Sequence, residues 1–254
     1  MTTVTEVWLR RYQPRPAPAF RLVCLPHAGG AASSFREWGA QLPDSVELSA
    51  VQYPGREDRV NEPFATGIPE LAGSIALALR PLADCPLVLF GHGLGALVAY
   101  EVARVLQAAY SVHIDHLVVS GRRAPSLAVP GVVHKRPDQA VIDEISRLSG
   151  TSAELLRDYA FRRFFLAAIR SDFRLAETYR AEPGPKLTCP LTSVIGCDDI
   201  EVDAFHASCW SDHTTGPFTF RSLPGGHFYL LQDQEAVLHL LSICFAQRSN
   251  CVSG

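Results

Sequence analysis

The stretch "LVLFGHGLGALVAYEVAR" (residues 87–104) joins two hydrophobic patterns through a glycine-rich turn. Its first part is a short, continuous apolar run, which is typical of a strand covered on both faces of a sheet. In its second part Val98, Val102 and Val105 recur at helical spacing and predict an amphipathic helix. The turn between them is "GHGLG" (91–95). The stretch therefore predicts a buried strand that turns sharply into a helix.

Similar apolar runs recur on both sides of this stretch. They are "RLVCLP" (21–26), "ELSAVQYP" (47–54), "DHLVVSG" (115–121), "PLTSVIG" (190–196) and "FTFRSLPGG" (218–226). Helical patterns lie between them, for example in "LAGSIALALRPLA" (71–83) and near the C-terminus, where Val237, Leu241 and Cys244 share a face. Strands that alternate with helices predict an α/β fold with a mostly parallel central sheet flanked by helices.

Residues 130–185 break this alternation, because two or three consecutive helices are expected there with no strand between them. Their wide apolar face is formed by Leu155, Leu156, Tyr159, Phe164, Phe165, Ala168 and Ile169. These helices could form a layer packed on the core or a lid over a site at the edge of the sheet. We expect the lid, because the segment separates two strands that would otherwise be joined directly. The 254 residues are thus predicted to form a single domain, 1–254, with a helical lid inserted at 130–185.

The composition excludes several classes of function. A formal net charge of -3 argues against nucleic acid as the main partner, since binding to phosphates needs a concentrated basic surface. The N-terminal 20 residues lack the apolar core of a secretory signal, and no run approaches the length of about 18 apolar residues that a membrane span needs. Seven scattered cysteines with no CxxC pair indicate reduced thiols and neither a disulfide framework nor a metal site. A cytoplasmic protein without membrane contact is expected.

Two glycine-rich loops follow predicted strands and would meet at the carboxyl edge of the sheet, where ligands bind in parallel α/β folds. The turn 91–95 has the setting of a nucleophile elbow, a strand–turn–helix motif usually written Gly-x-Ser-x-Gly. The loop "CLPHAGGAASSF" (24–35) directs backbone N–H groups toward the same edge. By position, the N–H groups of Ala28 and Leu94 are candidates for an oxyanion hole.

Two later loops supply an acid and a base. In "VIGCDDIEV" (194–202) Asp199 is favoured over Asp198 as the carboxylate that orients a histidine, and in "LPGGHFYLLQD" (223–233) His227 follows a strand and a Gly-Gly turn. The order elbow, aspartate, histidine is that of an α/β-hydrolase triad. His27 and His92 are expected to be neighbours of this site, and His92 to be a structural member of the turn.

With these residues in place, the chain resembles the discrete type II thioesterases of nonribosomal peptide and polyketide pathways. The motifs that carry the resemblance span nearly the whole chain: "LPHAGG" (25–30), "YPGRE" (53–57), "GHGLGALVAYEVAR" (91–104), "VSGRRAP" (119–125), "RSDFRLAETY" (170–179) and "LPGGHFYL" (223–230).

The resemblance implies an α/β-hydrolase fold and the removal of acyl groups from the phosphopantetheine arm of an acyl or peptidyl carrier protein. It implies no bound cofactor and no metal, and the segment 130–185 would shape the acyl site. By motif position Asp199 and His227 correspond to two members of the triad, and Ala28 and Leu94 to the oxyanion donors.

The chain departs from the family at Gly93, which stands where the nucleophilic serine is expected. An acyl-enzyme needs a side-chain oxygen, so the family mechanism cannot operate with glycine there. No neighbour is expected to replace the serine, since Ser33, Ser34, Ser120 and Cys197 lie outside the elbow.

Three interpretations follow from Gly93. A native serine could have been changed by mutagenesis to trap a substrate, which the codon in the source gene would reveal. Alternatively, a natural enzyme could use His227 and Asp199 for proton transfer in an isomerisation, cyclisation, aldol-type reaction or direct attack by water. Finally, the chain could be a non-catalytic module that binds a carrier protein.

Overall fold

The computed structural model describes residues 3–149 and 159–249, and the side chains of residues 3–148 and 165–245. Its strands are β1 (Leu9–Arg10), β2 (Phe20–Leu25), β3 (Val46–Val51), β4 (Leu87–His92), β5 (Ile114–Ser120), β6 (Leu191–Gly196) and β7 (Phe218–Leu223). Its α-helices are α1 (Val4–Trp8), α2 (Trp38–Gln41), α3 (Ile68–Leu79), α4 (Leu94–Tyr110), α5 (Asp138–Ser149), α6 (Tyr159–Thr178), α7 (Ala204–Ser208), α8 (Tyr229–Gln232) and α9 (Gln234–Ser249). Short 3-10 turns join several of them.

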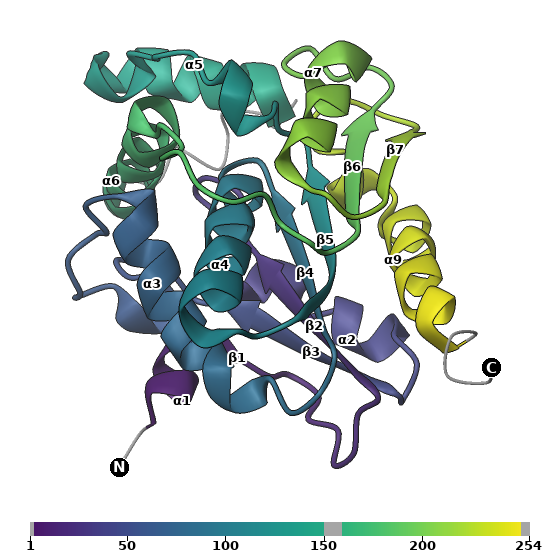
Figure 1. The fold of residues 1–254 in the computed structure, drawn as a ribbon. Helices are drawn as coiled ribbons and strands as arrows, with labels where there is room; N and C mark the ends of the chain where they lie inside the picture. The colour runs from purple at the N-terminus through teal and green to yellow at the C-terminus, as the bar shows by residue number, and fades with distance from the viewer. Residues whose placement is uncertain (1–2, 150–158, 250–254) are drawn as a thin grey trace.

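The strands form one seven-stranded sheet in the order β1-β3-β2-β4-β5-β6-β7 (Figure 1). All neighbouring strands pair in parallel except β1, which runs antiparallel to β3 at the edge. The predicted α/β-hydrolase fold with a mostly parallel sheet is confirmed, and each of the six predicted strands is present. The two-residue strand β1 was not predicted from the sequence.

Helices cover both faces of the sheet, which explains why its strands are apolar without strict alternation. In β2, Val23 and Leu25 pack in the core layer that contains α3 and α4. Leu22 and Cys24, which point to the opposite face, pack in the layer that contains α2 and α9. The sheet is therefore buried on both sides, and its carboxyl edge is the side left for a ligand.

The segment between β5 and β6 contains α5 and α6, with residues 150–158 outside the described part of the chain. Both helices lie beyond the carboxyl ends of the strands (Figure 1). The predicted face is described only in part, since Leu155 and Leu156 lie outside the described residues, as do the side chains of Tyr159 and Phe164. Of the remaining positions, Ala168 and Ile169 are buried and Phe165 is partly buried.

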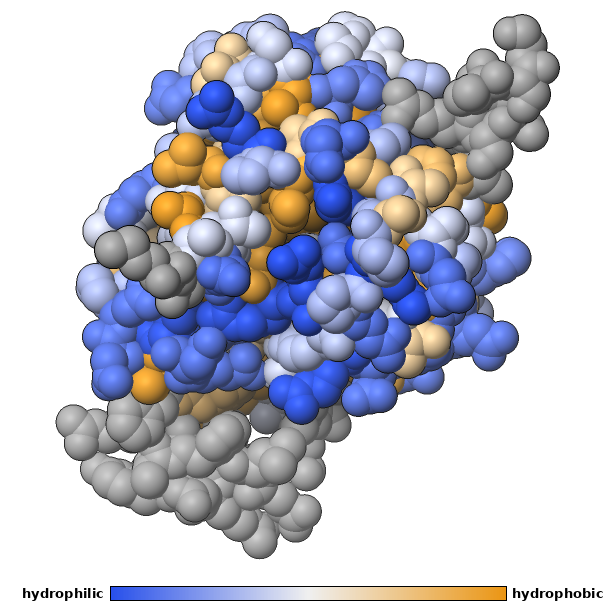
Figure 2. Space-filling model, turned by 90° about the horizontal axis from the view of Figure 1, so that it is seen from below, coloured by the Kyte–Doolittle hydropathy of each residue, from blue (hydrophilic) through white to orange (hydrophobic). Residues whose placement is uncertain are grey.

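The surface agrees with the ordinary charge composition of the chain. In the view from below, hydrophilic side chains cover most of the face, and apolar side chains lie between them (Figure 2). No helix among residues 3–149 and 159–249 is long and apolar enough to cross a membrane. Within the same ranges, all six cysteines are free thiols, and Cys251 lies outside them.

Candidate active site

The order of the strands brings the two glycine-rich loops together. β2 and β4 are neighbours, and Leu25 at the end of β2 pairs with Gly91 near the end of β4. The loops that follow β2 and β4 therefore begin side by side at the carboxyl edge of the sheet. This is the point where the order of the strands reverses. A cavity of about 510 Å³ opens there and is lined by Ala28, Gly93, Leu94 and His227, among others.

Gly93 stands at the tip of a sharp turn directly before α4, with φ 56° and ψ -114°. This conformation has the left-handed φ that strains any residue with a side chain, as expected at the tip of an elbow. The space around Gly93 is open: a Cβ atom added there would lie 3.7 Å from the Cβ atom of His27, its nearest neighbour. The turn thus has the backbone of a nucleophile elbow and room for a nucleophile, but no side chain.

Asp199 and His227 form the pair that the sequence predicts. His227 donates a hydrogen bond from Nδ1 to Asp199 Oδ2 at 2.9 Å. Asp199 Oδ1 accepts the backbone N–H groups of Glu201 at 2.8 Å and Val202 at 3.2 Å, and its side chain has no exposed surface. Asp198 is exposed instead. The arrangement fixes the imidazole ring and leaves Nε2 as the nitrogen that can exchange a proton with a bound molecule.

His27 and His92 both lie beside this pair. The ring centroid of His92 is 5.1 Å from that of His227 and 6.1 Å from that of His27. Burial lowers the pKa of His27 to about 4, with smaller contributions from the charges of His227 and Arg56. Burial, again the largest cause, also holds the pKa of His92 well below its usual value. Both rings are therefore neutral at physiological pH, and His227 is the member of the cluster that faces a fixed carboxylate.

His92 is held in place by a buried chain of hydrogen bonds. Its Nδ1 atom lies 2.8 Å from Ser120 Oγ, which lies 2.6 Å from the hydroxyl of Tyr229. All three residues are buried. His92 is thus a structural member of the turn, and Ser120 is committed to this chain, away from the position of a nucleophile.

A buried ion pair that the sequence did not assign holds the loop that contains Ala28, the candidate oxyanion donor. Arg56 donates two hydrogen bonds to Asp172 of α6, at 2.7 and 2.8 Å, and a third to the carbonyl of Gly30 at 3.0 Å. Asp172 also accepts the N–H of Gly29 at 2.8 Å. Gly29 directly follows Ala28, so this pair fixes the backbone beside the candidate oxyanion donor.

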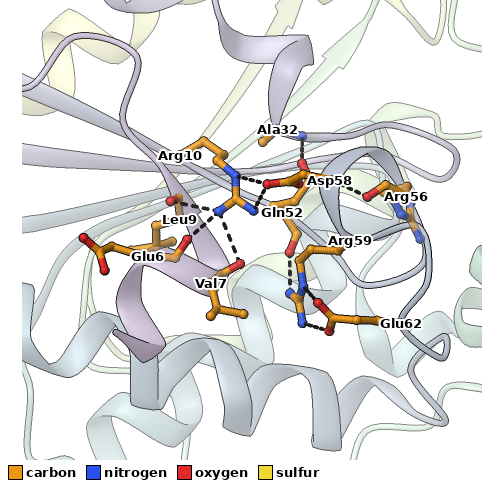
Figure 3. A network of polar contacts seen from close by, with 10 residues as sticks. All are labelled: Glu6, Val7, Leu9, Arg10, Ala32, Gln52, Arg56, Asp58, Arg59 and Glu62. Atoms are coloured by element: carbon orange, nitrogen blue, oxygen red, sulfur yellow. Dashed lines mark hydrogen bonds and ion pairs between the residues drawn. The ribbon is translucent and has the colours of Figure 1, made fainter. Parts of the chain in front are cut away.

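The segment that carries Arg56 is itself fixed by a polar network (Figure 3). Gln52 accepts the N–H of Ala32 at 2.9 Å and donates to the carbonyl of Arg56 at 3.0 Å. Arg59 donates to the carbonyl of Gln52 at 2.8 Å and pairs with Glu62 at 2.6 Å. The motifs "YPGRE" and "RSDFRLAETY" contain Arg56 and Asp172, but only the fold reveals that these residues meet.

The wall of the cavity opposite the sheet comes from the segment between β5 and β6. Its apolar side chains are Val129, Pro130, Val133, Ile145, Leu148, Phe165, Ile169, Phe173 and Ala176. Arg147 of α5 pairs with Glu144 on the same helix and with Glu201 in the loop of Asp199. No group of three or more His, Cys, Asp or Glu residues that could hold a metal occurs in the described part of the chain. The site therefore combines the hydrogen-bonded pair of Asp199 and His227 with a largely apolar cavity.

Comparison with known proteins agrees with this geometry. The chain is 48% identical to Thioesterase PikA5 of Streptomyces venezuelae, over 88% of this chain and 80% of that protein. It is 44% identical to a probable cadicidin biosynthesis thioesterase of Streptomyces griseus, over 91% of this chain and 63% of that protein. The solved structure of the type II thioesterase BorB from the borrelidin biosynthetic cluster is similar, with a TM-score of 0.87, 42% identity, and coverage of 96% of this chain and 98% of that one. The family model of the thioesterase domain matches residues 20–247, and the chain belongs to the thioesterase family.

Proposed function

We propose that this chain acts on acyl, peptidyl or polyketide chains that are held as thioesters on the phosphopantetheine arm of a carrier protein. The hydrogen-bonded pair of Asp199 and His227 carries the proposal, since it stands at a cavity that also contains the elbow. The names of its relatives supply the class of pathway, polyketide or nonribosomal peptide biosynthesis. The reaction of the family is editing or release of the chain by hydrolysis, and its acyl-enzyme route needs a nucleophile at position 93, where this chain has glycine.

Each group in the proposed site has a distinct role. The N–H groups of Ala28 and Leu94 stabilise the negative charge that develops on the thioester oxygen. Leu94 suits this role because it is the first residue of α4, where the N–H has no acceptor within the helix. His227 moves the proton, and Asp199 orients it and stabilises its charged form. The described parts of the segment 130–185 act as the lid that shapes the acyl cavity, and the substrate arrives on its carrier, in the cytoplasm, without a bound cofactor.

Gly93 removes the nucleophile from this scheme, so the direct test is to restore it. The Gly93→Ser variant is expected to hydrolyse acyl-N-acetylcysteamine thioesters at least about 100-fold faster than the unchanged chain, because a covalent route through serine becomes available. The open space around Gly93 accommodates the new side chain. The measurement is the release of free thiol, followed with a thiol-reactive dye.

Two matched variants control this experiment. Gly93→Ala has the same backbone strain without the hydroxyl and should stay as slow as the unchanged chain. Adding His227→Ala to Gly93→Ser should abolish the gain, because serine then has no base. A folded Gly93→Ser variant that releases no thiol would contradict the proposal.

A second candidate function is acid–base catalysis without an acyl-enzyme, and the intact Asp199–His227 pair favours it. The pair can abstract a proton from a pathway intermediate or activate water at the open tip of the elbow. His227→Ala in the unchanged chain would then remove turnover. A module that only binds a carrier protein would show no turnover, and its affinity would change little in the same variant.

A further inference from the structure

Arg122 lies at the cavity close to the acid–base pair. It follows Gly121 directly after β5 and is part of the cavity wall. Gly121 has φ 56°, and a Cβ atom added there would lie 2.5 Å from His92 Cε1 and 3.3 Å from His227 Cε1. The turn before Arg122 therefore lies close to the rings of His92 and His227, and Arg122 is the next residue along the chain.

The backbone of Arg122 is held firmly. Gly121 donates its N–H to the carbonyl of Val194 at 2.9 Å. The carbonyl of Arg122 accepts the indole N–H of Trp210 at 2.7 Å, and Trp210 is fully buried. Both neighbours belong to the core, so they fix the backbone from which the Arg122 side chain extends.

The guanidinium has more donors than partners. Its one hydrogen bond within the described residues runs from a terminal nitrogen to the carbonyl of Ala176, at 3.3 Å, and its Nε atom is buried without a partner there. Two carboxylates of the cavity wall are bound elsewhere: Glu177 to His134, and Glu201 to Arg147. Burial, followed by the charge of Arg123, lowers the pKa of Arg122 to about 10, so it remains charged at physiological pH.

We propose that Arg122 forms a polar subsite of the acyl cavity that binds a hydrogen-bond-accepting oxygen of the substrate chain. The subsite rests on the proposed function, in which the cavity holds an acyl chain. It implies that the preferred substrates are acyl chains with an oxygen substituent, and that plain hydrocarbon chains bind less tightly. The bond to Ala176 satisfies a carbonyl in the last turn of α6 and uses one N–H of the guanidinium. The terminal N–H groups that Ala176 does not use gain a partner when a carbonyl or hydroxyl oxygen enters the cavity, and an alkyl chain leaves them unsatisfied.

The test is a binding measurement, which does not need a nucleophile. The ligands are six-carbon acyl-N-acetylcysteamine analogues in which a methylene replaces the thioester sulfur, so that no hydrolysis occurs. One analogue is plain hexanoyl, and the others carry a 3-oxo, 3-hydroxy or 5-oxo group. Isothermal titration calorimetry with the unchanged chain should show at least one oxygenated ligand binding about 10-fold or more tightly than the hexanoyl analogue.

Two variants isolate the contribution of Arg122. Arg122→Met keeps the length of the side chain without its donors and should reduce the preference to less than about two-fold, with hexanoyl affinity retained. Arg123→Met is the matched control, because Arg123 also lines the cavity and is already bonded to the carbonyl of Glu201. The Arg123→Met variant should keep the preference for the oxygenated ligand over the hexanoyl analogue.

Three other outcomes of the binding experiment would contradict the proposed subsite. Equal binding of all ligands by the unchanged chain, or a preference that survives in Arg122→Met, would exclude the subsite and leave the proposed thioesterase function untouched. Failure of every ligand to bind would contradict the acyl cavity and the subsite together. Hydrolysis by Gly93→Ser is a separate measurement, so the two proposals fail independently.

Discussion

At the scale of single residues, the three glycines of the elbow are present for different reasons. A Cβ atom added at Gly91 would lie 2.1 Å from the carbonyl oxygen of Gly95, and one added at Gly95 would lie 2.1 Å from that of Leu25. These two positions admit no side chain without displacing backbone. Gly93 has room, and only its positive φ favours glycine. Its identity is therefore not imposed by packing.

This difference predicts the stability of two alanine variants. Gly93→Ala should lower the free energy of unfolding by about 1–2 kcal/mol, the cost of a left-handed φ for a residue with a side chain. Gly95→Ala should cost several times more or prevent folding, because backbone atoms must move. Urea denaturation monitored by circular dichroism measures both. Equal losses in the two variants would show that the elbow is less tightly packed than described.

At the scale of elements, α6 has two tasks. Its residues Ile169, Phe173 and Ala176 line the cavity. On the same helix, Asp172 binds Arg56 and the N–H of Gly29 and so holds the loop of Ala28, the candidate oxyanion donor. Asp172 has 1% and Arg56 8% of its surface exposed, so the pair stands in a region of low dielectric.

The ion pair can be tested against a surface pair of the same segment. Asp172→Asn should lower the free energy of unfolding by about 3–5 kcal/mol, because it leaves the charge of Arg56 buried without compensation. Asp138→Asn, which removes the partner of Arg170 on a carboxylate that is 69% exposed, should cost less than about 1 kcal/mol. Chemical denaturation of both variants provides the comparison. A loss in Asp172→Asn as small as that of Asp138→Asn would mean that α6 is not anchored through this pair.

At the scale of the whole molecule, buried histidines make stability depend on pH. Burial lowers the pKa of His116 to about 4, and it holds that of His92 well below the ordinary 6.5. Because these folded-state values lie below the unfolded one, the unfolded chain binds protons first as the pH falls. Their contribution is fully present above pH 6.5 and is lost from there toward pH 4, by about 2 kcal/mol for His116 at pH 5.

Urea unfolding at pH 7.5 and at pH 5 measures this loss. The variant His116→Gln keeps a polar partner for Thr192, which lies 2.8 Å from His116 Nε2, and removes the titrating group. Its stability should fall less between the two pH values. An unchanged slope would show that His116 does not contribute, and would assign the acid sensitivity of the fold to its other buried histidines or its carboxylates.

The features of the fold and site that could be predicted from the sequence are those that depend on local patterns. The strands, the main helices and the order of the site loops follow from hydrophobic periodicity and motif order, which are local properties of the chain. The sequence also favoured Asp199 over Asp198, and the structure brings Asp199 against His227. The catalytic roles of these residues, of Ala28 and of Leu94 stay predictions.

What the sequence did not reveal depends on contacts between distant segments. Arg56 and Asp172 are separated by 116 positions, and no periodic pattern links them. Arg122 belongs to a quoted motif, yet its unsatisfied donors become visible only when the cavity and Ala176 are in place. The short edge strand β1 has too few residues to form a recognisable alternation.

Because α6 both lines the cavity and holds the loop of Gly29, the shape of the cavity and the position of that loop depend on the same helix. If the cavity holds the acyl chain as proposed, a substitution that reshapes it on this helix is expected to move the carboxylate that binds Gly29 as well, so chain-length preference and rate should change together. Engineering of selectivity is therefore better directed to cavity residues outside α6, such as Val129 and Leu231, which are exposed and lie at the cavity.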